Sequence, residues 1–208
     1  SKNCAFHPLN PMRFFFREFK SVTMKLFYSI AFAALITSCK QSPSVKTTTV
    51  QDQKTLIARG EYLVTLAGCN DCHSPKVMTP EGPQPDPSKL LSGHPSGMPL
   101  PAEKGTGEWV YFHMNGTATK GPWGVSYAAN LTPDETGIGN WTEEQFLSAM
   151  KEGSYKGMKG ARKLLPPMPW PAYSKMHDDD VKAIFAYLKS IKPVPNIVPA
   201  PQPPQANK

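Results

Sequence analysis

The sequence predicts an all-α fold with few helices and long irregular loops, and three observations support this prediction. Apolar side chains recur at helical spacing in three segments, residues 54–68, 141–153 and 178–192. Residues 74–140, between the first two of them, are rich in Gly and Pro and carry turn signals such as "EGPQPDP". Proline, at 23 of 208 residues, is well above its ordinary usage of about 5%. A chain of this length is expected to build one domain with a real core.

The first predicted helix is "KTLIARGEYLVTLAG", residues 54–68, in which the spacing of the apolar side chains gives one buried side. Gly68 is expected to end this helix. Gly60 interrupts it at a cost of about 1 kcal/mol. A glycine at this point would allow another element to approach closely, so we expect a helix contact there.

The second predicted helix lies in "WTEEQFLSAMKEG", residues 141–153. Thr142 and Gln145 match a capping box at its beginning, and Gly153 ends it. The third, "DDDVKAIFAYLKSIK", carries three acids at its positive end and lysines at its negative end. Its apolar residues follow the i, i+3, i+4, i+7 pattern, so one face is buried. Short strands are expected only around residues 108–114, "EWVYFHM".

The amino-terminal segment, residues 1–38, is interpreted as a targeting signal. An 11-residue stretch, Leu26 to Ile36, is apolar except for Ser29, which is the size of a signal-peptide core and about half of a membrane span. It ends in "LITSC", so that small residues stand directly before Cys39. Such a cysteine resembles a bacterial lipobox and predicts an exported, membrane-anchored lipoprotein on the periplasmic side. The alternative is ordinary cleavage with an incidental Cys39.

The remaining chain divides into three parts. Residues 39–53 are polar and predict a flexible tether, 54–192 the folded domain, and 193–208 a Pro-rich, extended and partly disordered tail. Five basic residues and one acidic residue lie in 1–38, so the rest of the chain carries only +3 of the formal charge of +7. The charge therefore does not favour nucleic acid as a partner.

The stretch "GCNDCHSP" carries the chemistry. Cys69 and Cys72 stand three apart with His73 directly after them, which is the spacing of c-type haem attachment. Two such cysteines on a helical turn reach both vinyl groups, and the adjacent histidine points at the iron from the same face. A zinc site is the first alternative, but it needs a fourth ligand, for which His94 and His113 are candidates. A redox disulfide is the second, but no β-branched run precedes Cys69. One covalent haem c is favoured.

The second axial position of such a haem needs its own ligand. Met168 in "LLPPMPW" lies between Pro167 and Pro169. A thioether is a soft ligand of low basicity that needs a rigid loop to hold it on iron. The sequence therefore favours His73 and Met168 as the two metal ligands. Met98 in "GMPLP", a histidine, or an open position are the alternatives.

These residues together resemble a known family. The helix leading to "CNDCH", the late Pro-flanked methionine and the closing helix "AIFAYLKSI" are similar to class I cytochromes c. The phrases "GPWGVSYAANLTPDETGIGNWTEEQF" and "LLPPMPWPAYSKMHDDDVKAIFAYLKS" resemble more particularly the cytochrome c domains that partner periplasmic dehydrogenases. The resemblance covers residues 54–192 and is looser between Ser74 and Lys120. Many relatives carry two or three such domains, whereas this chain has one.

The resemblance implies the class I cytochrome c fold around one covalent haem. It implies attachment at Cys69 and Cys72, with His73 as proximal and Met168 as distal ligand. It also implies that the first and last helices cross, for which Gly60 and Tyr187 are the expected contact.

The predicted function is one-electron transfer between redox partner proteins, a donor such as a dehydrogenase and a downstream acceptor. Ligands on both sides of the iron leave no position for substrate, so we expect an electron carrier with no catalytic residues and not an enzyme. The alternative is a haem peroxidase or a gas or redox sensor with a displaceable distal ligand. Basic residues before Met168 predict partly electrostatic docking: Lys151, Lys156, Lys159, Arg162 and Lys163.

Overall fold

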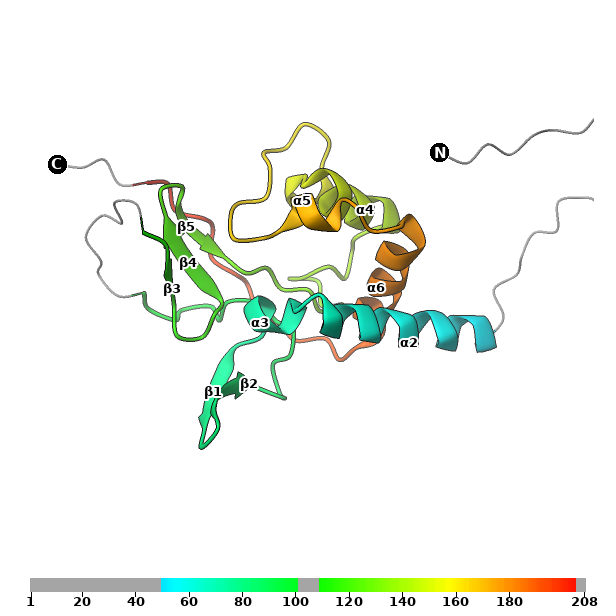
Figure 1. Cartoon of the computed structure of the whole chain (residues 1–208), viewed down its shortest axis with the longest axis horizontal. Coiled ribbons are helices and arrows are strands. Elements are labelled where there is room, and N and C mark those ends of the chain that lie inside the picture. The colour runs from blue at the N-terminus through cyan, green and yellow to red at the C-terminus, as the bar shows by residue number, and fades with distance from the viewer. Residues whose placement is uncertain (1–49, 101–108, 205–208) are drawn as a thin grey trace, which may run out of the picture. The chain divides into compact units, whose positions relative to one another are not determined.

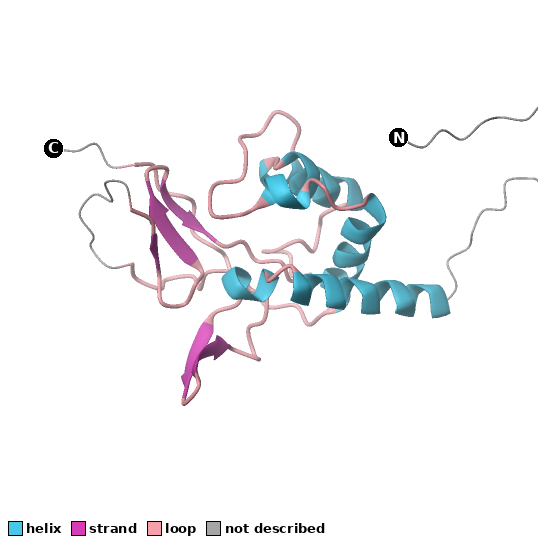
Figure 2. Ribbon diagram, in the orientation of Figure 1, coloured by secondary structure: helices cyan, strands magenta, loops and turns pink. Residues whose placement is uncertain are grey.

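The computed structural model describes residues 50–100 and 109–204 of the chain. Figures 1 and 2 show helices and short strands joined by long loops. In chain order the elements are α2 (Val50–Leu66), α3 (Cys69–His73), β1 (Lys76–Thr79), β2 (Gly82–Pro85), β3 (Tyr111–Phe112), β4 (Ala118–Gly121), β5 (Gly124–Tyr127), α4 (Glu143–Glu152), the 3-10 helix η2 (Tyr155–Gly157), α5 (Trp170–Tyr173) and α6 (Asp178–Ser190).

The crossing of α2 and α6 is present as expected, and Figure 1 shows the two helices meeting at one end of the described fold. A side chain at Gly60 would overlap the carbonyl of Ala183 and would lie 2.7 Å from Cβ of Tyr187. Only glycine lets the two backbones come this close. At the edge of the crossing, Arg59 forms an ion pair of 3.0 Å with Asp180.

The other two predicted helices are also confirmed, together with their ends. In α4 the Thr142 hydroxyl accepts a hydrogen bond of 3.2 Å from the Gln145 amide, and the Thr142 amide donates one of 2.9 Å to the Gln145 side chain. Gly153 ends α4 with a left-handed φ of 66°, a conformation that glycine adopts at little cost. α6 begins with its three acids and buries one apolar face.

The core lies where these three helices meet. It also includes two residues from loops, Leu91 and Ile138, each of which is 1% exposed. The buried helical side chains are Leu63, Val64, Phe146, Met150, Val181, Ala183, Ile184 and Leu188. Burial of this continuous apolar cluster is the main favourable term that holds the helices together.

The expectation of an all-α fold is only partly confirmed, because two small antiparallel sheets are present. One is the hairpin β1–β2, in which Val77 lies opposite Gln84. The other has the strand order β3-β4-β5, with Lys120 opposite Val125. Of the strands expected at 108–114, only Tyr111–Phe112 is assigned. Each strand has only two to four residues, too few for an alternation of apolar and polar residues to be recognised in the sequence.

Both ends of the domain differ in detail from the sequence expectation. α2 begins at Val50, within the segment expected to be a tether. Residues 193–204 are extended but hydrogen-bonded to the domain: the Asn196 side chain donates to the carbonyls of Ser92 and His94, and Gln202 pairs with Val125. The described part of the tail is therefore packed against the domain.

The predicted targeting signal (residues 1–38) and Cys39 lie outside the described residues. Among the helices within 50–100 and 109–204, none has the length and apolar character to cross a bilayer.

Candidate functional site

The cysteine motif forms a helix of its own, α3. Gly68 adopts a φ of 66° and turns the chain from the end of α2 into Cys69. Positions i, i+3 and i+4 of a helix lie on one face, so Cys69, Cys72 and His73 share a face of α3. The Lys76 ammonium donates to the carbonyls of Asn70 and Asp71 in α3 and of Ser74 directly after it, at 2.6–3.0 Å. It thereby satisfies carbonyls that have no partner within the helix.

The two cysteines are free thiols that are not activated as nucleophiles. Burial raises the pKa of Cys69 to about 11; a backbone hydrogen bond opposes the rise, and Asp71 and Cys72 add to it. The pKa of Cys72 is also raised, by burial and by Asp71, against the opposing charge of Lys76. Redox-active cysteine pairs depend instead on a lowered thiol pKa. These thiols therefore lack the lowered pKa on which thiol exchange depends.

His73 is buried and has one ring nitrogen engaged. Its Nδ1 donates a hydrogen bond of 2.8 Å to the Ala129 carbonyl. Because that nitrogen carries the proton, Nε2 is the nitrogen that can bind a metal. Burial lowers the pKa of His73; the Ala129 carbonyl opposes this, and Lys76 lowers it further. The neutral, oriented imidazole fits the requirements of a metal ligand.

Two backbone segments enclose His73. The Gly93 amide donates to the His73 carbonyl at 2.8 Å, and the His94 amide donates to the Ala128 carbonyl at 2.9 Å. Gly93 has a φ of 79°, and a Cβ there would lie 2.6 Å from the Ala128 oxygen. The segment before His94 thus lies directly against the residues that accept the His73 hydrogen bond.

Met168 lies in the loop between η2 and α5. Its side chain is partly buried against the hydrophobic core cluster, which Cys69 also contacts. The Ser126 hydroxyl donates to the Pro166 carbonyl at 2.6 Å, and the Tyr173 hydroxyl donates to the Ala67 carbonyl at 2.7 Å. These bonds join the chain on either side of Met168 to β5 and to the turn before Cys69.

Met98, the alternative thioether, has a different environment. Its sulfur accepts a hydrogen bond of 3.0 Å from the side-chain amide of Asn115, in the turn between β3 and β4. Neither Met98 nor Asn115 belongs to the core cluster or to the residues packed on it.

The histidines considered for zinc do not join the cysteines. In the part of the chain that the structure describes, no three His, Cys, Asp or Glu side chains come together as a metal site. His94 is fully buried and shares a hydrogen bond with Thr117, and its ring lies 6.1 Å from that of His113. His177 is exposed at the beginning of α6.

Two contributors to the site were not foreseen. Ala129 acts through its backbone carbonyl, which no side-chain pattern can indicate. Tyr173 acts through a hydroxyl whose acceptor lies 106 residues away in the sequence.

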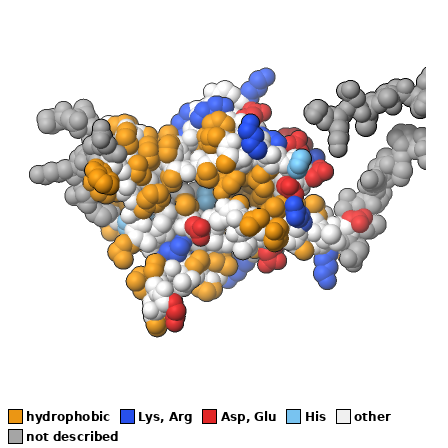
Figure 3. All heavy atoms as spheres, in the orientation of Figure 1, with side chains coloured by type: hydrophobic (Ala, Val, Ile, Leu, Met, Phe, Trp, Pro, Cys, Tyr) orange, Lys and Arg blue, Asp and Glu red, His pale blue; other side chains and the backbone are white. Residues whose placement is uncertain are grey.

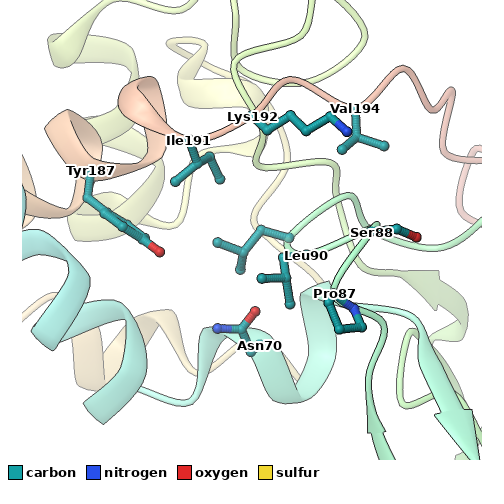
Figure 4. A pocket seen from close by; sticks show the side chains of 9 residues that line it. Asn70, Pro87, Ser88, Leu90, Tyr187, Ile191, Lys192 and Val194 are labelled. Carbon is teal, nitrogen blue, oxygen red and sulfur yellow. The ribbon is translucent and has the colours of Figure 1, made fainter.

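A small cavity next to α3 does not extend the site. Figure 4 shows it between Asn70 of α3, Leu90, Tyr187 of α6, and Ile191 directly after α6. Its volume is about 100 Å³, whereas ligand pockets usually measure about 300–1,000 Å³.

The family model that matches this chain, and three relatives similar to it, are cytochromes c or cytochrome subunits. The family model described as cytochrome c matches residues 57–192. The chain is 33% identical over 141 residues to the cytochrome c subunit of a quinone alcohol dehydrogenase from Gluconobacter oxydans (strain 621H), covering 67% of this chain and 22% of the relative. It is 34% identical over 140 residues to the fructose dehydrogenase cytochrome subunit of Gluconobacter japonicus, covering 66% and 22%.

A third relative is the gluconate 2-dehydrogenase cytochrome c subunit of Pantoea cypripedii, at 32% identity over 146 residues, covering 69% of this chain and 25% of the relative. The chain therefore spans a quarter or less of the length of each of these three curated relatives.

Proposed function

Since the chain belongs to the cytochrome c family, we propose that it is an exported monohaem cytochrome that transfers single electrons between protein partners. The resemblance noted in the sequence, to cytochromes that partner dehydrogenases, is confirmed by the family match and the relatives. A haem c in this family supplies a reversible one-electron change at its iron.

The observation that carries the proposal is the state of α3. Two free, partly buried thiols lie on one helical face with an imidazole whose Nδ1 is bonded to the Ala129 carbonyl, which leaves Nε2 for a metal. Cys69 and Cys72 would hold the haem through thioether bonds, and His73 would bind the iron. The Ala129 carbonyl orients the imidazole and increases its basicity.

We propose Met168 as the second ligand. It packs on the same core cluster as Cys69, and the bonds of Ser126 and Tyr173 restrain the chain on both sides of it. The sulfur of Met98 instead accepts a hydrogen bond from Asn115. Histidine and methionine together leave no iron position for substrate, and methionine raises the reduction potential. This ligand set supports an electron carrier and not an enzyme.

The proposed haem attachment can be tested by mass and by extraction. Mature wild-type protein should carry the mass of one haem, which acid and organic solvent do not remove. Cys69→Ala with Cys72→Ala should release it. Cys39→Ser, which replaces a cysteine outside the motif, should leave the haem attached. A haem that is extracted intact from wild type would contradict covalent attachment.

We propose further that Cys39 carries a lipid and that a membrane dehydrogenase is one partner. The apolar run ending at "TSC" supports the first part. The relatives named as dehydrogenase cytochrome subunits support the second. Cys39→Ser should move the protein from the membrane to the soluble fraction with its haem intact. A variant that stays on the membrane would contradict the lipid anchor.

A further inference from the structure

We propose that His94 is a positioning residue for His73, which it affects through Thr117 and the backbone of Ala128 and Ala129. The proposal rests on the proposed function, in which His73 binds the haem iron, and names a residue that tunes that site.

His94, Thr117 and Ala128 are joined by three hydrogen bonds that form a closed triangle. Nδ1 of His94 and the hydroxyl of Thr117 share a hydrogen bond of 2.9 Å. The Thr117 carbonyl accepts from the Ala128 amide at 2.9 Å, and the Ala128 carbonyl accepts from the His94 amide at 2.9 Å. The amide and the carbonyl of Ala128 are thereby both held, the amide by Thr117 and the carbonyl by His94.

This triangle of hydrogen bonds lies next to the hydrogen bond between His73 and Ala129. Ala129, the next residue, offers the carbonyl that accepts from Nδ1 of His73 at 2.8 Å. On the other side, the Gly93 amide donates to the His73 carbonyl at 2.8 Å. A displacement of His94 would therefore move Ala129 and Gly93 together, and both contact His73.

The surroundings of His94 are rigid. The ring is 0% exposed and lies 4.8 Å from the ring of Tyr127, and Thr117 is 1% exposed. The Asn196 side chain donates to the His94 carbonyl at 2.8 Å. Because the His94 ring is tightly packed, a change of the ring should shift the backbone of Ala128, which is hydrogen-bonded to the His94 amide, and with it Ala129.

His94 should act on His73 through the backbone of Ala128 and Ala129, and not through the loop that contains Met168. Successive side chains of a strand point to opposite faces of the sheet. Tyr127 packs on His94, whereas Ser126, its neighbour in β5, bonds to Pro166 two residues before Met168. The ring of His94 and the loop of Met168 thus adjoin opposite faces of β5.

The physical consequence is a change in the donor strength of His73. A hydrogen bond from Nδ1 to a carbonyl makes the imidazole a more basic ligand. A more basic ligand stabilises the oxidised iron and lowers the reduction potential. If the triangle loosens, the bond to Ala129 lengthens, and the potential should rise.

The experiment compares two matched pairs in the haem-loaded protein. Thr117→Val removes the hydroxyl at nearly constant shape, and Thr117→Ser keeps it. His94→Leu removes the ring nitrogen, and His94→Asn keeps a polar atom near the place of Nδ1. His177→Asn is the control on the surface. The midpoint potential and the solvent exchange rate of the His73 Nδ1 proton, by NMR, are measured beside the thermal midpoint.

We expect Thr117→Val and His94→Leu to raise the potential and to speed proton exchange several-fold. Thr117→Ser, His94→Asn and His177→Asn should stay close to wild type. If Thr117→Val lowers the thermal midpoint but matches Thr117→Ser in potential and exchange, the triangle is merely structural and the inference is wrong. A wild type whose absorption spectrum lacks haem contradicts the proposed function itself, so the two failures are distinguishable.

Discussion

The Tyr173 hydroxyl donates a hydrogen bond of 2.7 Å to the Ala67 carbonyl, which joins α5 to the turn before Cys69. Burial raises the pKa of Tyr173, and the nearby Cys69, Cys72 and Asp71 raise it further, so the hydroxyl stays protonated and can donate. This one bond connects the segment that follows Met168 to the segment that carries the cysteines.

Tyr173→Phe should therefore loosen the Met168 segment with little change in packing. The free energy of unfolding should fall by about 1 kcal/mol, the net value of a typical hydrogen bond. Reduced Tyr173→Phe should also begin to bind carbon monoxide, as followed by absorption after mixing, because the Met168 segment is less restrained. Tyr155→Phe, in η2, is the control and should not bind it. A reduced Tyr173→Phe that binds no carbon monoxide would show that the bond does not restrain the proposed ligand.

Gly60 gives a prediction about stability alone. Gly60→Ala should lower the free energy of unfolding by about 1–3 kcal/mol, because the added methyl overlaps the Ala183 carbonyl. Ala58→Gly, at an exposed position of the same helix, should cost about 1 kcal/mol through propensity alone. Denaturant unfolding of both proteins measures this. A more stable Gly60→Ala would mean that the helices do not cross as described.

The sequence was sufficient where the signal is local. The capping box of Thr142 and Gln145, the stop at Gly153 and the apolar face of α6 all depend on neighbours within a few turns, and each is present. The contact of Gly60 with Tyr187 was implied by the resemblance and is confirmed by the crossing of α2 and α6.

The sequence was insufficient where structure depends on distant pairing. β2, "GPQP", has two prolines and no β-branched residue, so only its pairing with β1 makes it a strand. At the site, the residue types of the cysteine motif indicate haem, but the acceptor for His73 is a backbone carbonyl 56 residues away. A carbonyl has no residue signature, so the environment of His73 could not be foreseen.

The buried His94 predicts a dependence of stability on pH. Burial lowers the pKa of His94; the Met98 carbonyl opposes this, and His113 lowers it further. The ring also faces Tyr127, whose pKa is raised by burial. The unfolded chain, where the histidine titrates near 6.5, thus binds more protons below that pH than the folded protein does.

The free energy of unfolding should consequently fall as the pH drops from about 7.5 through 6.5 toward the lowered pKa of the folded state. His94→Asn should flatten this slope, and His177→Asn should keep it. Denaturant titrations of the haem-loaded proteins at several pH values measure this slope. Any contribution of His73 is the same in wild type and in both variants, so it does not affect the comparison. An unchanged slope in His94→Asn would contradict the prediction.

The basic residues before Met168 give a prediction about rates. Lys151 is partly neutralised by an ion pair of 2.9 Å with Asp178. Lys156, Lys159 and Arg162 are exposed, and Figure 3 shows basic side chains gathered over the loop after α4. Arg162 also stacks on Tyr155, with its guanidinium carbon 3.9 Å from the ring centroid. Exposed charges act on encounter within a Debye length of about 8 Å at physiological salt.

Oxidation of the reduced protein by ferricyanide, an anionic probe, should slow as salt rises. Lys156→Glu with Lys159→Glu should weaken that salt dependence, whereas Lys54→Glu, at the exposed beginning of α2, should leave it near wild type. A wild-type rate independent of ionic strength would remove these lysines from the docking mechanism.

The ligand assignment is tested most directly by the near-red absorption band of oxidised protein, which arises from sulfur bound to haem iron. We predict that wild type shows this band, that Met168→Ala loses it and gains the ability to bind carbon monoxide when reduced, and that Met98→Ala keeps the band. The haem should stay covalently attached in all three, because Cys69 and Cys72 are unchanged. A band that survives Met168→Ala and disappears in Met98→Ala, or a wild type that already binds carbon monoxide, would contradict the account.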